Sequence, residues 1–221
     1  MVTLNGGKPV MLASTAESGF KITAAQLEQA ITDKTKWLLV NSPNNPSGSM
    51  YTAAEFRDIA AVLERHPQVY LMIDEIYEHF SYDEAYVSLA TYSETLRART
   101  LVVNGVSKAY AMTGWRIGYA AAPRALAQAM ANIQSHATSN PNSIAQKAAV
   151  VALTGDQEPV DKMLAEFTRR REYMAQGINT IPRLSCRKPE GAFYIFADAS
   201  RLFGKTIRGQ KINGSVDLAE V

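Results

Sequence analysis

The residues with the clearest chemical potential lie in one run, residues 104–118, which reads Asn-Gly-Val-Ser-Lys-Ala-Tyr-Ala-Met-Thr-Gly-Trp-Arg-Ile-Gly. Lys108 has small and apolar neighbours there, and a lysine amine that is withdrawn from water acts as a nucleophile towards an aldehyde. Arg116 carries a planar, permanently charged guanidinium that suits a phosphate group. A solvated surface lysine and a surface ion pair are the commoner explanations when each residue is taken singly, so the case depends on other segments.

A second polar segment is the loop at residues 41–48, Asn-Ser-Pro-Asn-Asn-Pro-Ser-Gly, which follows the apolar run 37–40. Two prolines and a glycine in eight residues exclude a regular helix or strand. The segment is therefore a shaped loop, and Asn45 is its candidate for contact with a ligand.

A third polar segment, Asp74 to Tyr77, follows the apolar run 69–73. A carboxylate at the end of a buried strand costs free energy unless it has a partner, which favours a functional role for Asp74. A helix N-cap or turn residue is the simpler explanation of Asp74 from its position alone, and both interpretations stay open.

The elements that must position these loops follow from capping signals and apolar periodicity. Thr23 with Gln26, and Thr52 with Glu55, have capping-box spacing, and apolar residues at helical spacing follow each box. The expected helices cover residues 24–31, a segment that begins after Thr52, and residues 123–136, 141–154 and 158–178. The expected strands cover residues 37–40, 69–73, 101–103, 117–122 and 192–196.

The alternation of strands and helices predicts an α/β fold with a mostly parallel sheet flanked by helices. Ligands of such sheets bind outside the carboxyl ends of the strands, so the three polar loops should meet at one rim. The strand expected at 192–196 follows a long helix and marks the start of a smaller α+β domain. We therefore divide the chain into a large domain, residues 1–180, and the start of a small domain, residues 181–221.

Composition excludes several classes of protein. A formal net charge of +2 over 221 residues gives no reason to expect nucleic acid or an anionic membrane as a partner. The three arginines at 169–171 are interpreted as a solvated helix face. A single cysteine, Cys186, excludes an internal disulfide framework and fits a reducing compartment, so the cytoplasm is expected. The three histidines lie far apart with no metal-site spacing, and no metal is expected.

Three segments together carry a family resemblance: Asn-Asn-Pro-Ser-Gly (44–48), Asp-Glu-Ile-Tyr (74–77) and the run from Ser107 to Gly118. In this order they resemble the signature segments of fold type I enzymes that use pyridoxal 5′-phosphate, specifically the class I and II aminotransferases. The strings at 40–48 and 108–119 look closest to the bacterial aspartate aminotransferases. The expected fold then corresponds to the large domain of this family.

The resemblance implies a role for each candidate residue. Lys108 would form the Schiff base with the cofactor and move the catalytic proton, and Asp74 would pair with the pyridine nitrogen so that the ring accepts electrons. Asn45 and Tyr77 would contact the phenolic oxygen of the cofactor. The phosphate would be held by Arg116 with help from Ser107.

The resemblance also implies a reaction and partners. The protein would transfer an amino group between an amino acid, with aspartate favoured, and a 2-oxo acid, with 2-oxoglutarate favoured, and would act as a homodimer when full length. Members of the family carry more chain on both sides, so this chain is interpreted as a fragment that holds pyridoxal phosphate poorly when expressed alone. Two alternatives stay open: another fold type I chemistry such as that of a β-lyase, and an inactive truncated product.

Overall fold

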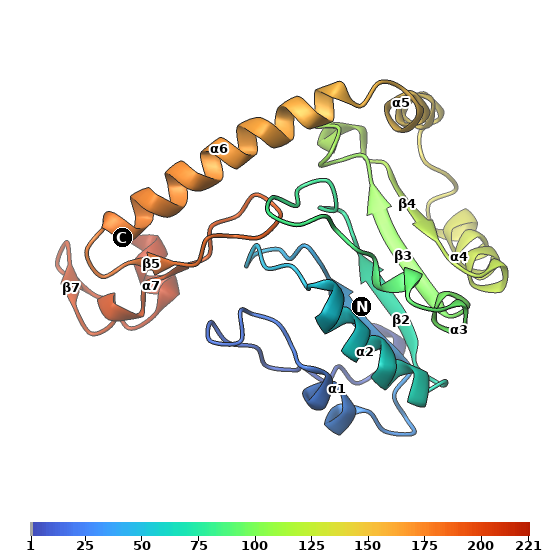
Figure 1. The fold of residues 1–221 in the computed structure, drawn as a ribbon, viewed down its shortest axis with the longest axis horizontal. Helices are drawn as coiled ribbons and strands as arrows, with labels where there is room; N and C mark the ends of the chain where they lie inside the picture. Colours follow the sequence, from blue (N-terminus) through green and yellow to red (C-terminus); the bar gives the residue numbers. More distant parts are fainter. Residues whose placement is uncertain (1) are drawn as a thin grey trace.

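The computed structural model describes residues 2–221, and a four-stranded sheet forms its centre (Figure 1). The strands lie side by side in chain order, the first three parallel and the last antiparallel to its neighbour. They are β1 (Trp37–Asn41), β2 (Tyr70–Asp74), β3 (Thr100–Gly105) and β4 (Gly118–Ala121). The expected α/β fold with a mostly parallel sheet is confirmed.

One face of the sheet is covered by α1 (Ala24–Ala30) and α2 (Ala53–Arg65). Both helices begin at the expected capping boxes, because the hydroxyls of Thr23 and Thr52 accept from backbone N–H groups inside the helix. The apolar stripe of α2 packs on the inward side chains of β1 and β2, and all of its members are buried. This layer is the main hydrophobic core of the described chain.

The other face of the sheet is open. Alternate residues of β1 point away from the core, so that Trp37 is 42% and Leu39 63% exposed. Tyr70 on β2 and Tyr119 on β4 are exposed in the same way. Among the described residues, the helices α1 and α2 therefore cover one face of the sheet, and these side chains of the other face are exposed.

The remaining helices are α3 (Glu94–Arg97), α4 (Arg124–Ala137), α5 (Ser143–Thr154) and α6 (Glu158–Thr180). The last three match the helices expected from sequence to within a few residues. Short 3-10 turns occupy Thr3–Asn5, Leu89–Thr91, Thr113–Trp115 and Ser200–Leu202. The long helix α6 runs from beside α5 to the C-terminal part of the chain (Figure 1).

The C-terminal part holds only short elements. They are the antiparallel pair β5 (Ser185–Cys186) and β6 (Ala197–Asp198), the hairpin β7 (Thr206–Ile207) with β8 (Gln210–Lys211), and α7 (Ser215–Glu220). The strand expected at 192–196 is wrong. Ala192 has a φ of 54°, which no strand accommodates, and its N–H bonds to the carbonyl of Phe80 at 2.9 Å instead of to a neighbouring strand.

The arginine cluster at 169–171 also differs from expectation. Arg169 and Arg170 are exposed and pair with Glu166, as a solvated face should. The side chain of Arg171, however, is 4% exposed and makes two contacts with Asp83, at 2.8 and 2.9 Å, and one with the Pro189 carbonyl at 3.2 Å. Its guanidinium lies over the ring of Tyr82, so Arg171 joins α6 to residues 77–83.

Within residues 2–221, none of the helices combines the length and apolar character needed to cross a bilayer. In the same residues, no group of three or more His, Cys, Asp or Glu side chains is arranged to hold a metal ion.

Candidate active site

The carboxyl ends of β1, β2 and β3 bring the starts of the three polar loops to one rim. The register pairs Asn41 with Asp74 and Asp74 with Val103. Beyond the paired residues, the N–H of Ser42 bonds to the Asp74 carbonyl at 3.1 Å and the N–H of Glu75 to the Val103 carbonyl at 2.9 Å. The three polar loops therefore begin next to one another, as the parallel register requires.

Side-chain amides fix the shape of the loop at residues 41–48. The Asn41 side-chain oxygen accepts from the N–H of Asn45 at 2.8 Å, and that of Asn44 accepts from the Ser47 N–H and hydroxyl. Gly48 closes the loop with a φ of 68°, and a Cβ there would lie 2.3 Å from the Pro189 Cβ. Only a glycine permits this turn together with the close approach of the segment 189–194.

The amide of Asn45 and two phenols meet at this rim. Tyr77 and Tyr194 share a hydrogen bond of 2.5 Å between their hydroxyls, and the Asn45 side-chain nitrogen donates to the Tyr194 oxygen at 3.3 Å. Burial, followed by the hydrogen bond with Tyr194, raises the pKa of the Tyr77 phenol well above its usual value. Tyr77 is therefore a neutral hydrogen-bonding group at physiological pH.

Lys108 lies beside the same phenol. Its Nζ is 5.8 Å from the centroid of the Tyr77 ring and 5.9 Å from that of Phe193. In the described part of the chain, no carboxylate lies within ion-pair distance of this amine. The structure thus presents the amine beside two aromatic rings and without a carboxylate partner.

Asp74 lies at the end of β2, half-buried, where its carboxylate accepts from the N–H of Ile76 at 3.1 Å. This is the geometry of an Asx turn, which is the structural role weighed for this residue from sequence. One carboxylate oxygen makes that contact. The turn uses only part of the hydrogen-bonding capacity of the carboxylate, so it is compatible with a further partner.

Ser107 and Arg116 are not joined to this cluster by any contact among residues 2–221. Arg116 is exposed, has a φ of 56°, and donates to the Thr113 carbonyl at 2.9 Å. Ser107 is half-buried directly before Lys108. The structure therefore brings Asn45, Tyr77 and Lys108 together, places Asp74 at the same sheet edge, and leaves Arg116 exposed.

Sequence reasoning missed Tyr194 and Phe193 as members of the site. They belong to the segment 189–194, whose Glu190 and Gly191 N–H groups bond to the Gly48 carbonyl at 2.9 and 2.8 Å. The signal that could have found them is the Pro-Glu-Gly turn at 189–191, which argues against a strand immediately afterwards.

Two acidic residues near the rim are also new. Glu75 is 4% exposed and accepts from the Ser88 hydroxyl, and burial raises the pKa of its carboxyl. Glu78 accepts from the Asn104 side chain at 2.6 Å. These contacts connect residues 74–80 to Asn104 of β3 and to Ser88, and so hold Tyr77 in position.

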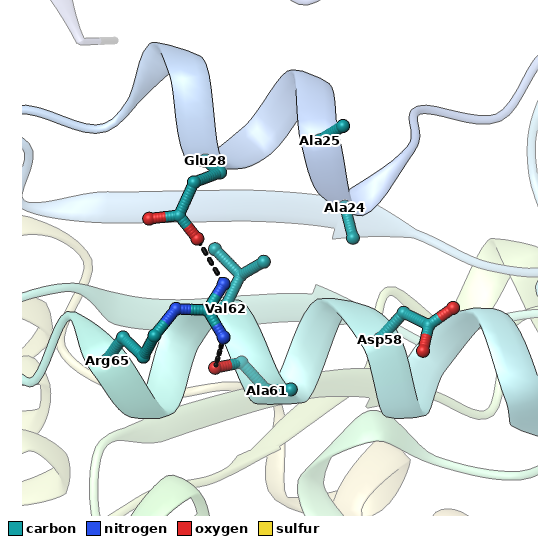
Figure 2. A pocket seen from close by; sticks show the side chains of 7 residues that line it. All are labelled: Ala24, Ala25, Glu28, Asp58, Ala61, Val62 and Arg65. Atoms are coloured by element: carbon teal, nitrogen blue, oxygen red, sulfur yellow. Dashed lines mark hydrogen bonds and ion pairs between the residues drawn. The ribbon is translucent and has the colours of Figure 1, made fainter.

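A surface hollow elsewhere on the molecule lies between α1 and α2. Figure 2 shows Glu28 of α1 reaching across it to Arg65 of α2, and the two side chains form an ion pair. The other residues that line it are Ala24, Ala25, Asp58, Ala61 and Val62. None of the candidate site residues lines this hollow, and its ion pair joins two helices on the covered face of the sheet.

Comparisons with known proteins agree with the arrangement at the rim. A family model described as aminotransferase class I and II matches residues 1–215. The chain is 52% identical over 213 residues to an aspartate aminotransferase of Rhizobium meliloti (strain 1021), covering 96% of this chain and 52% of that protein. It is 51% identical over 210 residues to an aspartate/prephenate aminotransferase of Cereibacter sphaeroides, covering 95% of this chain and 52% of that protein.

Solved structures give the same picture. The crystal structure of the aspartate aminotransferase from Rhizobium meliloti superposes with a TM-score of 0.94 at 51% identity, over 99% of this chain and 55% of that one. An aromatic aminotransferase from Pyrococcus horikoshii gives a TM-score of 0.84 at 39% identity, over 89% of this chain and 52% of that one. The chain spans about half the length of the relatives it matches.

Proposed function

This chain belongs to the class I and II aminotransferases, and we propose that the protein of which it forms a part transfers an amino group between an amino acid and a 2-oxo acid. Aspartate is the favoured amino acid, because relatives about half identical in sequence are named aspartate aminotransferases. We propose 2-oxoglutarate as the favoured acceptor, as the family resemblance implies. The observation that carries the proposal is the unpaired Lys108 amine held against Tyr77 and Phe193 at the rim of the sheet.

Class I and II aminotransferases of this fold use pyridoxal 5′-phosphate, and the chemistry of the residues at the rim fits that group. An amine without a carboxylate partner suits an aldehyde, and a carboxylate at the strand end suits a pyridine nitrogen. The amide of Asn45 and the neutral phenol of Tyr77 are hydrogen-bond donors, which suits a phenolic oxygen. When bound, this cofactor withdraws electrons from the α-carbon of a substrate amino acid.

In this proposal Lys108 has two tasks. Its Nζ would hold the cofactor before substrate arrives, and the freed amine would then carry away the proton removed from the substrate α-carbon. The centroids of the Tyr77 and Phe193 rings lie 5.8 and 5.9 Å from the amine, and the rings limit where it can move. A base held in this way reacts faster than a mobile one, because less orientation must be achieved during the reaction.

The other residues bind and orient. Asp74 would hold the proton on the pyridine nitrogen, and Asn45 and Tyr77 would donate to the phenolic oxygen. Arg116 would supply a charged fork for the phosphate, assisted by the Ser107 hydroxyl. In this structure Arg116 is exposed and donates only to the nearby Thr113 carbonyl.

We also propose that the protein acts as a homodimer in the cytoplasm and that residues 1–180 and 181–221 belong to different domains. Exposed apolar side chains on α4 and α5, such as Ile133 and Ile144, support an association that covers them. The close packing of residues 189–194 against the loop at 41–48 means that the proposed second domain contacts the site.

The test uses the complete gene product. Borohydride reduction after addition of pyridoxal phosphate should fix the cofactor on the peptide that contains Lys108, as measured by mass mapping. Lys108→Ala should slow amino transfer from aspartate to 2-oxoglutarate by several orders of magnitude, because both cofactor capture and proton transfer are lost. A label on a different lysine, or full activity in Lys108→Ala, would end the assignment.

A further inference from the structure

The phenol of Tyr194 occupies the centre of a short hydrogen-bonded chain. Its oxygen is 3.3 Å from the Asn45 side-chain nitrogen and 2.5 Å from the Tyr77 oxygen. The amide nitrogen has protons and no acceptor lone pair, so in the Asn45 to Tyr194 contact Tyr194 must accept. Its own proton remains free to be donated elsewhere.

The direction of the next hydrogen bond follows from the proposed task of Tyr77. A phenol that donates to a ligand oxygen cannot give the same proton to Tyr194, so Tyr194 must be the donor in their shared bond. Asn45 has a second amide proton, which it can donate to the ligand. With a ligand oxygen present, the donors then run in one order: Asn45 to Tyr194, Tyr194 to Tyr77, and Tyr77 to the ligand.

The backbone around Tyr194 holds it in this place. Glu190 and Gly191 bond to the Gly48 carbonyl, and Ala192 adopts a φ of 54° while bonding to Phe80. The adjacent Phe193 ring packs edge-on against Tyr77 with centroids 5.2 Å apart. Because three successive residues are fixed by backbone bonds, the Tyr194 hydroxyl has little freedom to leave Tyr77.

The charged groups that face Tyr77 agree with a proton-donating role. Burial, followed by the contact with Tyr194, raises the pKa of the Tyr77 phenol, and the charge of Asp74 adds a smaller increase, while hydrogen bonding by Asn45 lowers it. The Lys108 amine lies over the Tyr77 ring face. The phenol thus keeps its proton, which it needs in order to donate.

From this geometry we propose that Tyr194 is a positioning residue, which directs the hydroxyl proton of Tyr77 towards the phenolic oxygen of bound pyridoxal phosphate. The inference rests on the proposed function, since it needs the cofactor at this rim. Tyr194 itself makes no contact with the cofactor in this scheme. Its effect is to stabilise the ionised phenolic oxygen through Tyr77.

The test compares Tyr194→Phe with wild type in the complete gene product. Removal of one orienting hydrogen bond should weaken pyridoxal phosphate binding by about three- to tenfold. It should also raise the pKa at which the absorption maximum of the bound cofactor changes, by up to about one unit, because the ionised oxygen loses part of its stabilisation. Fluorescence titration gives the Kd, and absorption spectra across a pH series give the pKa.

The matched control is Tyr82→Phe, which removes a phenol that donates to the Ala192 carbonyl in the same segment and does not touch Tyr77. It should leave the pKa of the bound cofactor unchanged, while both variants should have similar melting temperatures. An unchanged pKa in Tyr194→Phe, or an equal shift in Tyr82→Phe, overturns the inference and leaves the proposed function intact. A wild-type protein that binds no pyridoxal phosphate overturns the proposed function, and the inference with it.

Discussion

The two sides of the candidate site are built differently. The tyrosine side, formed by Asn45, Tyr77 and Tyr194, is fixed by hydrogen bonds among three segments and by the close contact of Gly48 with Pro189. The lysine side, residues 104–118, carries Lys108 at its start but leaves Arg116 exposed with a single local hydrogen bond. The helix that follows it, α4, has no buried residue within the described chain.

The difference shows that a residue can lie near the site without being held in the orientation that binding needs. The tyrosine side has its donors in place before any ligand binds, whereas the lysine side gives its guanidinium no fixed direction towards a phosphate. Preorganised groups lower the cost of binding and of reaching the transition state. We therefore expect substitutions on the tyrosine side to change turnover or stability, and substitution of Arg116 on the lysine side to change mainly cofactor binding.

Apart from the loss of Lys108 itself, the largest effect is expected at Asp74, which borders the tyrosine side. Asp74→Asn should lower turnover by a factor that corresponds to several kcal/mol, about 3 to 5, in the proton-transfer barrier, because an unprotonated pyridine accepts electrons poorly. Cofactor affinity should change much less. Rapid-mixing kinetics and a cofactor titration measure the two quantities. Normal turnover with cofactor bound would show that Asp74 serves only the turn at Ile76.

The next largest effect is expected at Gly48, where a substitution tests how much the close contact with Pro189 contributes to the stability of the tyrosine side. Gly48→Ala should lower the free energy of unfolding by about 3 kcal/mol, since the new methyl group meets Pro189 and the backbone has a positive φ. Gly204→Ala is the control, because Gly204 has a φ of 78° but open space around it, and should cost about 1 kcal/mol. Urea denaturation gives both values. Equal losses of unfolding free energy in the two variants would mean that Pro189 moves aside at little cost when a methyl group is added at Gly48.

The smallest effect is expected at Arg116 and concerns the lysine side alone. Arg116→Ala should weaken pyridoxal phosphate binding by about ten- to a hundredfold, the range for charged hydrogen bonds, with little change in stability because the side chain is exposed. Arg124→Ala, at an exposed arginine that begins α4, is the matched control and should bind normally. Unaltered binding by Arg116→Ala would remove this residue from the proposed site.

Local signals in the sequence predicted most of the fold. The capping boxes at Thr23 and Thr52 place α1 and α2 correctly, because their hydrogen bonds span only three residues and depend on no distant partner. The apolar runs that form β1, β2 and β3 are similarly local. These elements agree with their own propensities, which is why single-segment reasoning locates them.

The errors arose where distant contacts decide the structure. Arg171 is buried because Asp83, 88 residues away in sequence, meets it, and nothing near Arg171 separates it from its exposed neighbours. The segment 192–196 has strand-like composition, but bonds to Gly48 and Phe80 impose a turn. The pairing of Tyr77 with Tyr194 spans 117 residues, so a pattern within either segment could not reveal it.

The buried position of Arg171 has a consequence for how the molecule responds to ionic strength. Added salt screens exposed charges, so the pairs of Glu166 with Arg169 and Arg170 should contribute little in concentrated electrolyte. Arg171 is shielded from solvent and also contacts an uncharged carbonyl and an aromatic ring. The same helix therefore carries a salt-sensitive outer surface and a salt-tolerant attachment to the residues around Tyr77, so that electrolyte alone should not detach α6 from the site.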